Sequence, residues 1–358
     1  MGYGTLKVDI LENSTGMIAS TMSPGFRNRV INGDMRIYQR NTAATADVTY
    51  SVDRWQIKKS NDASESVAQS TDAPTGFVYS LRNTVVTTDT SIGAAQYSAL
   101  SQSIEGPNIH DWLFGTANAR TLTLSFWIKS SVTGTYSGNL CTYNTEARIF
   151  VFSYTVNNAN TWEYKTVTIP GDTSGTWSIS STGGATLHFY AALGSNFTGG
   201  VAGAWDVPSK YGVPQVNALA TVGNIFAISG VQLEVGSFAT SYDHRPFGLE
   251  LLLCQRYYHR LVPTQTYGPI GVGRAWGSNN GNVGFYLPTS MRANPTITYS
   301  ALSDFDVVGA GDPTGIQNDG SSQQATKVGY TRGVSSGSFY QFEFKTNLSA
   351  WLAFSAEM

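Results

Sequence analysis

Charged residues are unusually few in this chain. Lysine, arginine, aspartate and glutamate make up 13% of its 358 residues, about half of the ~25% found in an ordinary soluble domain. The 22 basic and 24 acidic residues leave a net charge of −2, and the basic residues form no run. Because such a surface offers no positive field to nucleic acid or anionic lipid, we expect neither among the partners.

Cysteine is scarcer still. Cys141 and Cys254 are the only two, and their separation gives no sign of a disulfide framework, so we expect two free, buried thiols. The N-terminal segment lacks the basic and apolar parts of a signal peptide. No uncharged stretch has the leucine and isoleucine content needed to span a bilayer. We therefore expect synthesis in a cytoplasm, without a leader and without membrane insertion.

Motifs that carry chemistry are missing as well. The four histidines fit no metal-ligand or catalytic spacing, and HExxH and CxxC do not occur. The segment "GAGDPTG" (309–315) resembles a phosphate loop only superficially, because the GK[ST] ending and a following helix are lacking. We expect no enzyme activity and no cofactor. Paired carboxylates for sugar hydrolysis stay open, because they need only be neighbours in space.

The chain is instead rich in residues that favour turns and strands. It holds 37 glycines, and aromatic residues reach 12%. In "TLTLSFWIKS" (121–130), Leu122, Leu124, Phe126 and Ile128 alternate with more polar residues, as in a half-buried strand. Similar runs follow at intervals, with no helical period between them. This pattern predicts an all-β protein built on a jelly-roll β-sandwich rather than on βαβ units.

The segment "RNRVINGDMRIYQR" (27–40) opens the first domain with a break. Apolar residues flank Asn32-Gly33-Asp34, whose residue types favour positive φ, so we expect a strand, a turn or bulge, and a second strand. Such a break makes a sandwich corner, and residues 225–235 are its natural pairing partner. The Asp34 carboxylate is a candidate ligand for a structural Ca²⁺, with a hydrogen-bonded turn as the alternative.

Four zones follow one another along the chain: an N-terminal arm (1–25), the jelly roll (26–247), a connecting helix (248–260) and a smaller C-terminal β-sandwich (261–358). The helix is predicted from apolar residues at helical spacing between two prolines, namely Leu249, Leu252, Leu253 and Tyr257. Within the last zone, residues 309–327 read as a long polar loop.

Surface recognition is the function that remains. Several aromatic residues lie among Asn, Ser and Gly in loop-like segments, where an aromatic ring can stack on a sugar and an amide can bind its hydroxyls. For each tryptophan, packing in the core or between subunits is the alternative. The candidates for glycan contact are Trp276, Asn279, Asn280, Trp205, Tyr211 and Trp112.

Several long motifs occur in one order: "NRVINGDMRIYQR…DRWQ" (28–56), "SQSIEGPNIHDWLFGTANARTLTLSFWIKSSVTGTY" (101–136), "TWEYKTVTIPGDTSGTW" (161–177) and "GVQLEVGSFATSYDHRPFGLELLLCQRYYHR" (230–260). Together they resemble bacteriophage and prophage tail-fibre, or receptor-binding, proteins. The layout of residues 26–247 is also similar to jelly-roll carbohydrate-binding modules. The resemblance implies a β-sandwich, a place in the virion, homotrimeric assembly and binding to host-surface glycan. It provides no catalytic motif.

These observations predict a tail-fibre adhesin that binds host polysaccharide without chemistry. Residues 1–25 would dock to another tail or baseplate protein, and the C-terminal domain would face the receptor through Trp276–Asn280 and residues 309–327. Apolar residues cover more than one face of the helix, so it would pack against its copies in a homotrimer. One alternative is a structural virion protein, in the head decoration or baseplate, without receptor contact. A second is a polysaccharide depolymerase.

Overall fold

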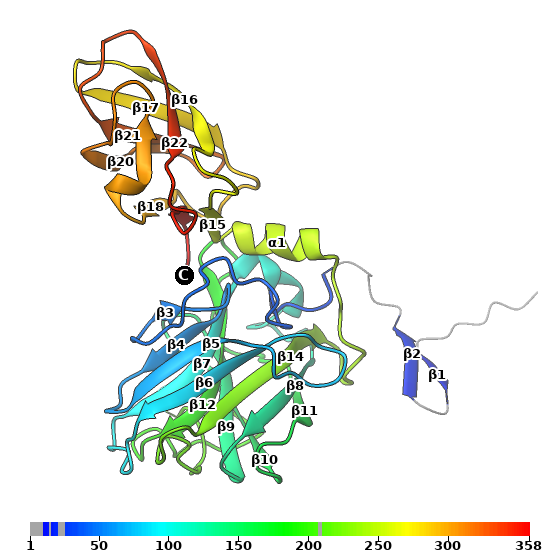
Figure 1. The fold of residues 1–358 in the computed structure, drawn as a ribbon. Coiled ribbons are helices and arrows are strands. Elements are labelled where there is room, and N and C mark those ends of the chain that lie inside the picture. Colours follow the sequence, from blue (N-terminus) through cyan, green and yellow to red (C-terminus); the bar gives the residue numbers. More distant parts are fainter. Residues whose placement is uncertain (1–9, 14–15, 21–25, 207–209) are drawn as a thin grey trace, which may run out of the picture.

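A computed structural model describes residues 10–13, 16–20, 26–206 and 210–358. It confirms the all-β fold class: in the described part of the chain, one α-helix, α1 (Phe247–Gln255), lies between a large and a small β-sandwich (Figure 1). None of the helices in that part is long and apolar enough to cross a bilayer. The N-terminal arm contributes a hairpin of β1 (Ile10–Asn13) and β2 (Gly16–Ser20), while its other residues lie outside the described ranges.

The large sandwich is a jelly roll of two antiparallel sheets. The five-stranded sheet has the order β11-β8-β14-β6-β5, and the seven-stranded sheet has the order β13-β10-β9-β12-β7-β4-β3. The core lies between them and includes the four alternating residues of 121–130, all with 0% exposure as their pattern predicted. The strands are β3 (Thr49–Tyr50), β4 (Gln56–Lys59), β5 (Ser64–Ser70), β6 (Ser80–Thr87), β7 (Tyr97–Glu105), β8 (Leu122–Ser130), β9 (Gly134–Thr142), β10 (Ile149–Val156), β11 (Glu163–Ile169), β12 (Gly183–Leu193), β13 (Trp205–Asp206) and β14 (Ile225–Val235), with short 3₁₀ turns at Gly106–Asn108 and His110–Trp112.

The small sandwich packs a three-stranded sheet, β15-β23-β18, on a six-stranded sheet, β19-β22-β16-β17-β21-β20. Its core contains a stack of Phe305 and Phe342, whose ring centroids lie 5.5 Å apart. The elements are β15 (Tyr258–Leu261), β16 (Pro269–Ala275), β17 (Asn280–Tyr286), β18 (Thr296–Tyr299), the 3₁₀ turn Leu302–Asp304, β19 (Phe305–Val307), β20 (Gly315–Ser321), β21 (Ala325–Thr331), β22 (Phe339–Phe344) and β23 (Leu352–Ser355).

Two boundaries in this half differ from the sequence prediction. The helix predicted over 248–260 ends at Gln255, because Tyr258–Leu261 pairs with β23 as the first strand of the small sandwich. The polar segment 309–327 is not a long loop, because Gly315–Ser321 forms β20 and pairs with β21. Its polar side chains belong to a strand with one face in solvent.

The opening segment contains no strand, which corrects the prediction of a strand, a turn and a strand over 27–40. It does lie beside β14, as predicted, through Arg29 N donating to Leu233 O and Val231 N donating to Gly33 O. The buried Asn28 carboxamide makes hydrogen bonds that a β-ladder would otherwise make. Its oxygen accepts from Val30 N and Leu233 N, and its nitrogen donates to Val231 O. A Cβ on Gly33 would lie 2.1 Å from Val231 O, so only glycine allows this approach.

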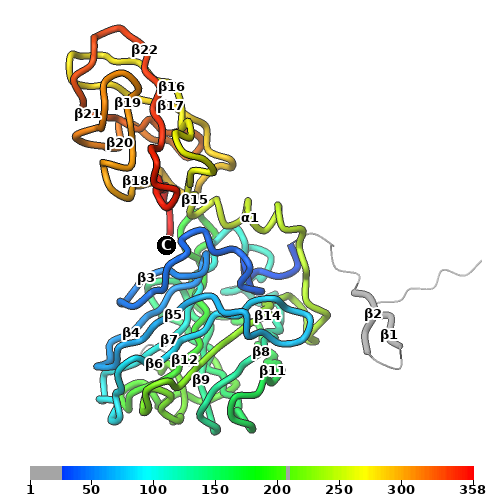
Figure 2. The backbone as a smooth tube through the Cα atoms, viewed as in Figure 1, coloured from blue at the N-terminus to red at the C-terminus, as the bar shows by residue number. Residues whose placement is uncertain are grey.

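The two sandwiches meet at a junction where the chain also ends (Figure 2). Glu357 reaches into the jelly roll and pairs with Arg54, whose side chain is 1% exposed and whose guanidinium lies 3.5 Å from the centre of the Tyr257 ring. Next to it, Arg256 forms two hydrogen bonds to Glu105 at 2.6 and 2.8 Å. Buried charges therefore fix the small sandwich onto the large one.

Candidate functional site

The outer face of the six-stranded sheet carries several exposed residues in the small sandwich. In β17 and β21, successive side chains alternate between the core and this face. Val283 and Val328 point inward with 0% exposure, whereas Gly284, Tyr286 and Lys327 are exposed.

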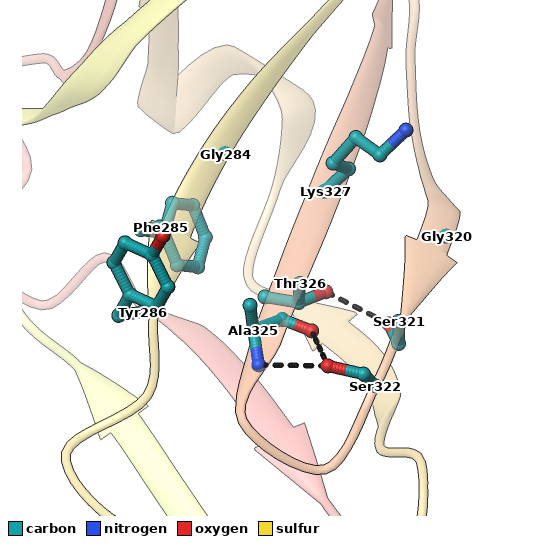
Figure 3. A pocket seen from close by; sticks show the side chains of 9 residues that line it. All are labelled: Gly284, Phe285, Tyr286, Gly320, Ser321, Ser322, Ala325, Thr326 and Lys327. Carbon is teal, nitrogen blue, oxygen red and sulfur yellow. Dashed lines mark hydrogen bonds between the residues drawn. The ribbon is translucent and has the colours of Figure 1, made fainter.

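A hollow of about 540 Å³ lies across the ends of β17, β21 and β20 on this face. Register places Gly284 and Gly320 opposite Lys327 on its two neighbouring strands, so the lysine stem lies between two residues without side chains. Tyr286 stands at the edge with 89% of its surface exposed, and Figure 3 shows its ring beside the open space. We call this hollow the β17–β21–β20 trough.

Glycines create the trough for different reasons. A Cβ on Gly284 would meet only the Lys327 Cγ, at 4.0 Å, so this glycine leaves space open without any backbone requirement. Gly320 has φ +137° beside a bulge in β20, a conformation that side-chain-bearing residues rarely adopt. The hydroxyl of Ser322 accepts from Ala325 N at 3.1 Å and holds the β20–β21 turn at the end of the trough.

The groups around the trough suit recognition of a sugar. Tyr286 offers a ring for stacking, and Ser321 and Ser322 offer hydroxyls for hydrogen bonds. Further along the face, Asn282 donates to Asp319 at 2.7 Å, which adds amide and carboxylate oxygen atoms. The exposed Lys327 ammonium adds a positive charge that favours a sugar carrying a carboxylate, sulfate or phosphate. The described lining contains no histidine, cysteine or carboxylate.

Three predicted contact residues lie at the other end of the same strand. Trp276 is 56% exposed, Asn279 is exposed, and Asn280 begins β17, whereas Tyr286 ends it. Seven strand residues span about 20 Å. The predicted residues therefore lie in the β16–β17 turn and at the start of β17, at the far end of that strand from the trough, and Tyr286 was missed. The available signal was the alternation in "NVGFYLP": Val283 and Phe285 share one face of the strand, so Tyr286 belongs to the other.

The three candidates in the large sandwich lie in packed surroundings. Trp112 has 0% exposure and packs on Phe114, so as a surface contact it was wrong: it is a core residue. Trp205 is half-buried and donates to Pro170 O at 2.8 Å within the same aromatic cluster. Tyr211 is half-buried and stacks on Phe197, with ring centroids 4.9 Å apart.

A second hollow, of about 310 Å³, lies on the outer face of the five-stranded sheet. Trp127 and Tyr164 are paired there with ring centroids 5.3 Å apart, and Tyr164 is 45% exposed. The register of β11 on β8 pairs Tyr164 directly with Trp127. The neighbouring Phe77 ring packs on Tyr242 over Gly230 and narrows this hollow.

Asp34, the predicted calcium ligand, lies beside a cationic side chain. Its carboxylate pairs with Arg36 at 3.1 Å, and one of its oxygens is buried without a hydrogen-bond partner. Burial raises the pKa of Asp34, and Arg36 opposes that rise. Its neighbour Glu250 is paired with Arg245 at 3.1 Å. Calcium binding stays a prediction, although the arginine at Asp34 already supplies a positive charge.

No family model matches the chain, and no curated protein matches it. Among solved structures, the enzymatically active domain of tailspike protein 4 from bacteriophage CBA120 matches at 15% identity and TM-score 0.33, over 60% of this chain and 22% of the tailspike. The family 11 carbohydrate-binding module of the Clostridium thermocellum cellulase Lic26A-Cel5E matches at 16% identity and TM-score 0.30, over 56% and 97%. The C-terminal family 22 module of Clostridium thermocellum Xyn10B matches at 13% identity and TM-score 0.31, over 55% and 94%. Similarity at this level carries no inference about what the chain binds.

Proposed function

We propose that the chain is a virion tail-fibre adhesin that binds a host-surface glycan in the β17–β21–β20 trough and does not alter it. The observation that supports this most directly is Tyr286, an aromatic ring 89% exposed beside an open trough with hydroxyl groups. A ring exposed to this degree contributes little to folding, whereas it gains contact when a sugar stacks on it. Because the Lys327 ammonium is positively charged, we propose an acidic glycan as the ligand.

The test uses the full chain on an array of neutral and acidic glycans and on host cells with and without surface polysaccharide. Tyr286→Ala removes the stacking ring, and we expect at least a tenfold loss of binding, equivalent to about 1.4 kcal/mol. Trp276→Ala is the matched control, because it removes another exposed aromatic residue, from the β16–β17 turn at the other end of β17. Loss with Trp276→Ala alone would place the site at the predicted residues, and binding unchanged in both variants would contradict a site on this sheet.

Self-association through α1 belongs to this proposal. The helix buries Glu250, Cys254 and the neighbouring Tyr257 against the opening segment of the jelly roll, with Leu253 half-buried. Leu249 and Leu252 remain 48% and 42% exposed. An apolar stripe of this kind gains stability when copies cover it, as in a homotrimer. Sedimentation at low concentration should give a trimer that Leu252→Gln weakens, and a monomeric wild-type protein would exclude this assembly.

A structural role in the virion is the second candidate function. On β16 and β22, Val272 and Phe339 are 64% and 74% exposed, which is unusual for a free surface and typical of a protein contact. Labelled protein that adsorbs to no host cell, together with Phe339→Ser particles that fail to assemble, would favour this role over receptor binding.

A further inference from the structure

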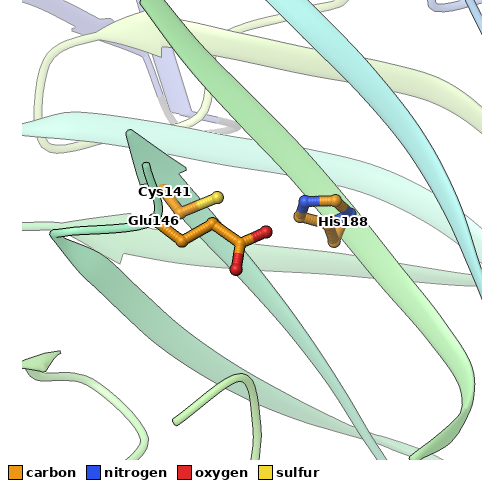
Figure 4. A group of neighbouring side chains, drawn as sticks. All are labelled: Cys141, Glu146 and His188. Atoms are coloured by element: carbon orange, nitrogen blue, oxygen red, sulfur yellow. The ribbon is translucent and has the colours of Figure 1, made fainter. Parts of the chain in front are cut away.

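Three side chains that differ in chemistry meet on the outer face of the seven-stranded sheet. Cys141 lies near the end of β9, Glu146 lies in the following turn, and His188 lies in the middle of β12. The thiol sulfur, a carboxylate oxygen and an imidazole nitrogen all lie within 4.8 Å of one another. Figure 4 shows the sulfur and the carboxylate pointing toward the imidazole.

We propose that Cys141, Glu146 and His188 bind one zinc ion. A thiolate, an imidazole and a carboxylate are zinc ligands, whereas Ca²⁺ and Mg²⁺ prefer oxygen atoms alone. Zinc–ligand bonds of about 2.0–2.3 Å place neighbouring ligand atoms about 3.3–3.8 Å apart in a tetrahedron. The three ligand atoms therefore need to move by only about 1 Å, through side-chain rotation, to reach zinc-binding distances. The fourth coordination position is left for water.

Hydrogen bonds already orient two of the ligands. His188 Nδ1 lies 2.7 Å from Ser101 Oγ, which fixes the ring and leaves Nε2 for the metal. The hydroxyl of Tyr211 donates to Glu146, holding the turn carboxylate over the sheet. Partners of this kind fix metal ligands in many zinc sites. The hydrogen-bond partner of Cys141 is the backbone oxygen of Thr186, its register partner, at 3.7 Å.

The surroundings provide a reason for an ion at this place. Cys141 and His188 are 2% and 4% exposed, because residues 211–215 cross over this face. Asn139, opposite His188 in the β9–β12 ladder, has a buried carboxamide oxygen without a hydrogen-bond partner. Water on the open coordination position would donate to such an oxygen. The ion would tie the β9–β10 turn to β12.

The experiment uses the full chain, stripped of metal by a chelator and then titrated with ZnCl₂ or CoCl₂. We expect one ion per chain, a near-ultraviolet charge-transfer band from Co²⁺ bound to thiolate, and a rise in Tm of about 5 °C or more at saturating zinc. Cys141→Ser, Glu146→Gln and His188→Gln keep the side chains close in size, and each should weaken zinc binding at least 100-fold. Their metal-free Tm values show whether they fold.

Two variants serve as matched controls. Cys254→Ser changes the other buried free cysteine, and His110→Gln changes an exposed histidine, so both should bind zinc as the wild type does. Zinc uptake that is equal in the wild type and in Cys141→Ser would show an adventitious ion only. Uptake without the thiolate band, or a wild-type chain that binds no zinc, would also overturn the proposal. None of these readouts depends on glycan binding.

Discussion

The two sandwiches treat the outer faces of their larger sheets in opposite ways. In the jelly roll, all eleven residues of β12 are buried, because the core covers one face and residues 211–215 help to cover the other. In the small sandwich, Gly284, Tyr286 and Lys327 on the outer face of β17 and β21 are exposed to solvent. When both faces of a sheet are covered, its buried polar side chains need hydrogen-bond or ion-pair partners. An open face instead leaves side chains available for contact with another molecule. This difference is why we propose the glycan site in the small sandwich and the bound ion in the large one.

Two glycines show the same difference at single positions. Gly33 allows the opening segment to approach β14, with its missing Cβ 2.1 Å from Val231 O. Gly284 faces open space, with its nearest prospective contact at 4.0 Å. The first glycine serves packing and the second leaves a hollow. Substitutions at the junction, in each sandwich and at these glycines can test whether the comparison holds.

The largest effect should come from the ion pair that joins the two regions. Glu357→Gln removes the partner of Arg54, whose side chain is 1% exposed, and leaves a buried cation uncompensated. We expect a loss of about 3–5 kcal/mol in the free energy of unfolding, measured by urea titration. The control is Asp312→Asn, which breaks the partly exposed pair with Lys345 and should leave the urea midpoint nearly unchanged. Equal, small effects would show that the junction is not fixed by this pair.

The next effect should separate the two glycine types. Gly33→Ala places a methyl group against the carbonyl of Val231, and we expect a loss of about 3 kcal/mol from forced displacement of the backbone. Gly277→Ala is the control in the small sandwich, because a Cβ there meets nothing within 4 Å. Thermal unfolding of both variants measures the difference. An unchanged Tm for Gly33→Ala would mean that the opening segment is not held tightly on β14.

A pH effect should follow from His259 beside the junction. Burial lowers its pKa to about 4, and its ring stacks on Phe354 with centroids 6.1 Å apart. Because the folded pKa lies below the ordinary value of 6.5, this histidine's contribution to stability is complete above about pH 6.5 and is lost as pH falls toward 4. We expect about 2 kcal/mol of loss across that window.

The measurement compares urea unfolding at several pH values in the wild type and in His259→Phe, which cannot titrate. Comparison with a variant is needed because burial also raises the pKa of Asp53 to about 7, which acts in the opposite direction as pH falls. The variant should lose less stability than the wild type between pH 6.5 and 4. Parallel curves would contradict a buried neutral histidine. His110→Gln, at an exposed site, should follow the wild type.

Sequence alternation predicted what lies within one strand and failed where several strands meet. The inward residues of 121–130 were correct because a period of two fixes their side of the sheet. The opening segment was wrong because the Asn28 carboxamide supplies bonds that a ladder would make. The trough depends on the register of Lys327 between two glycines. Likewise, Cys141 and His188 meet only through the β9–β12 ladder, and no spacing along the chain encodes that.

The smallest effect on stability should come from filling the trough. Gly284→Val adds a β-branched side chain at a strand position with open space, so the free energy of unfolding should change by no more than about 0.5 kcal/mol, toward greater stability. The same side chain occupies the space between Tyr286 and Lys327, so glycan binding should fall at least tenfold. Urea unfolding and glycan adsorption measure the two effects on one protein sample. Full binding by a stable, filled variant would show that the open face of the small sandwich is not where the ligand lies.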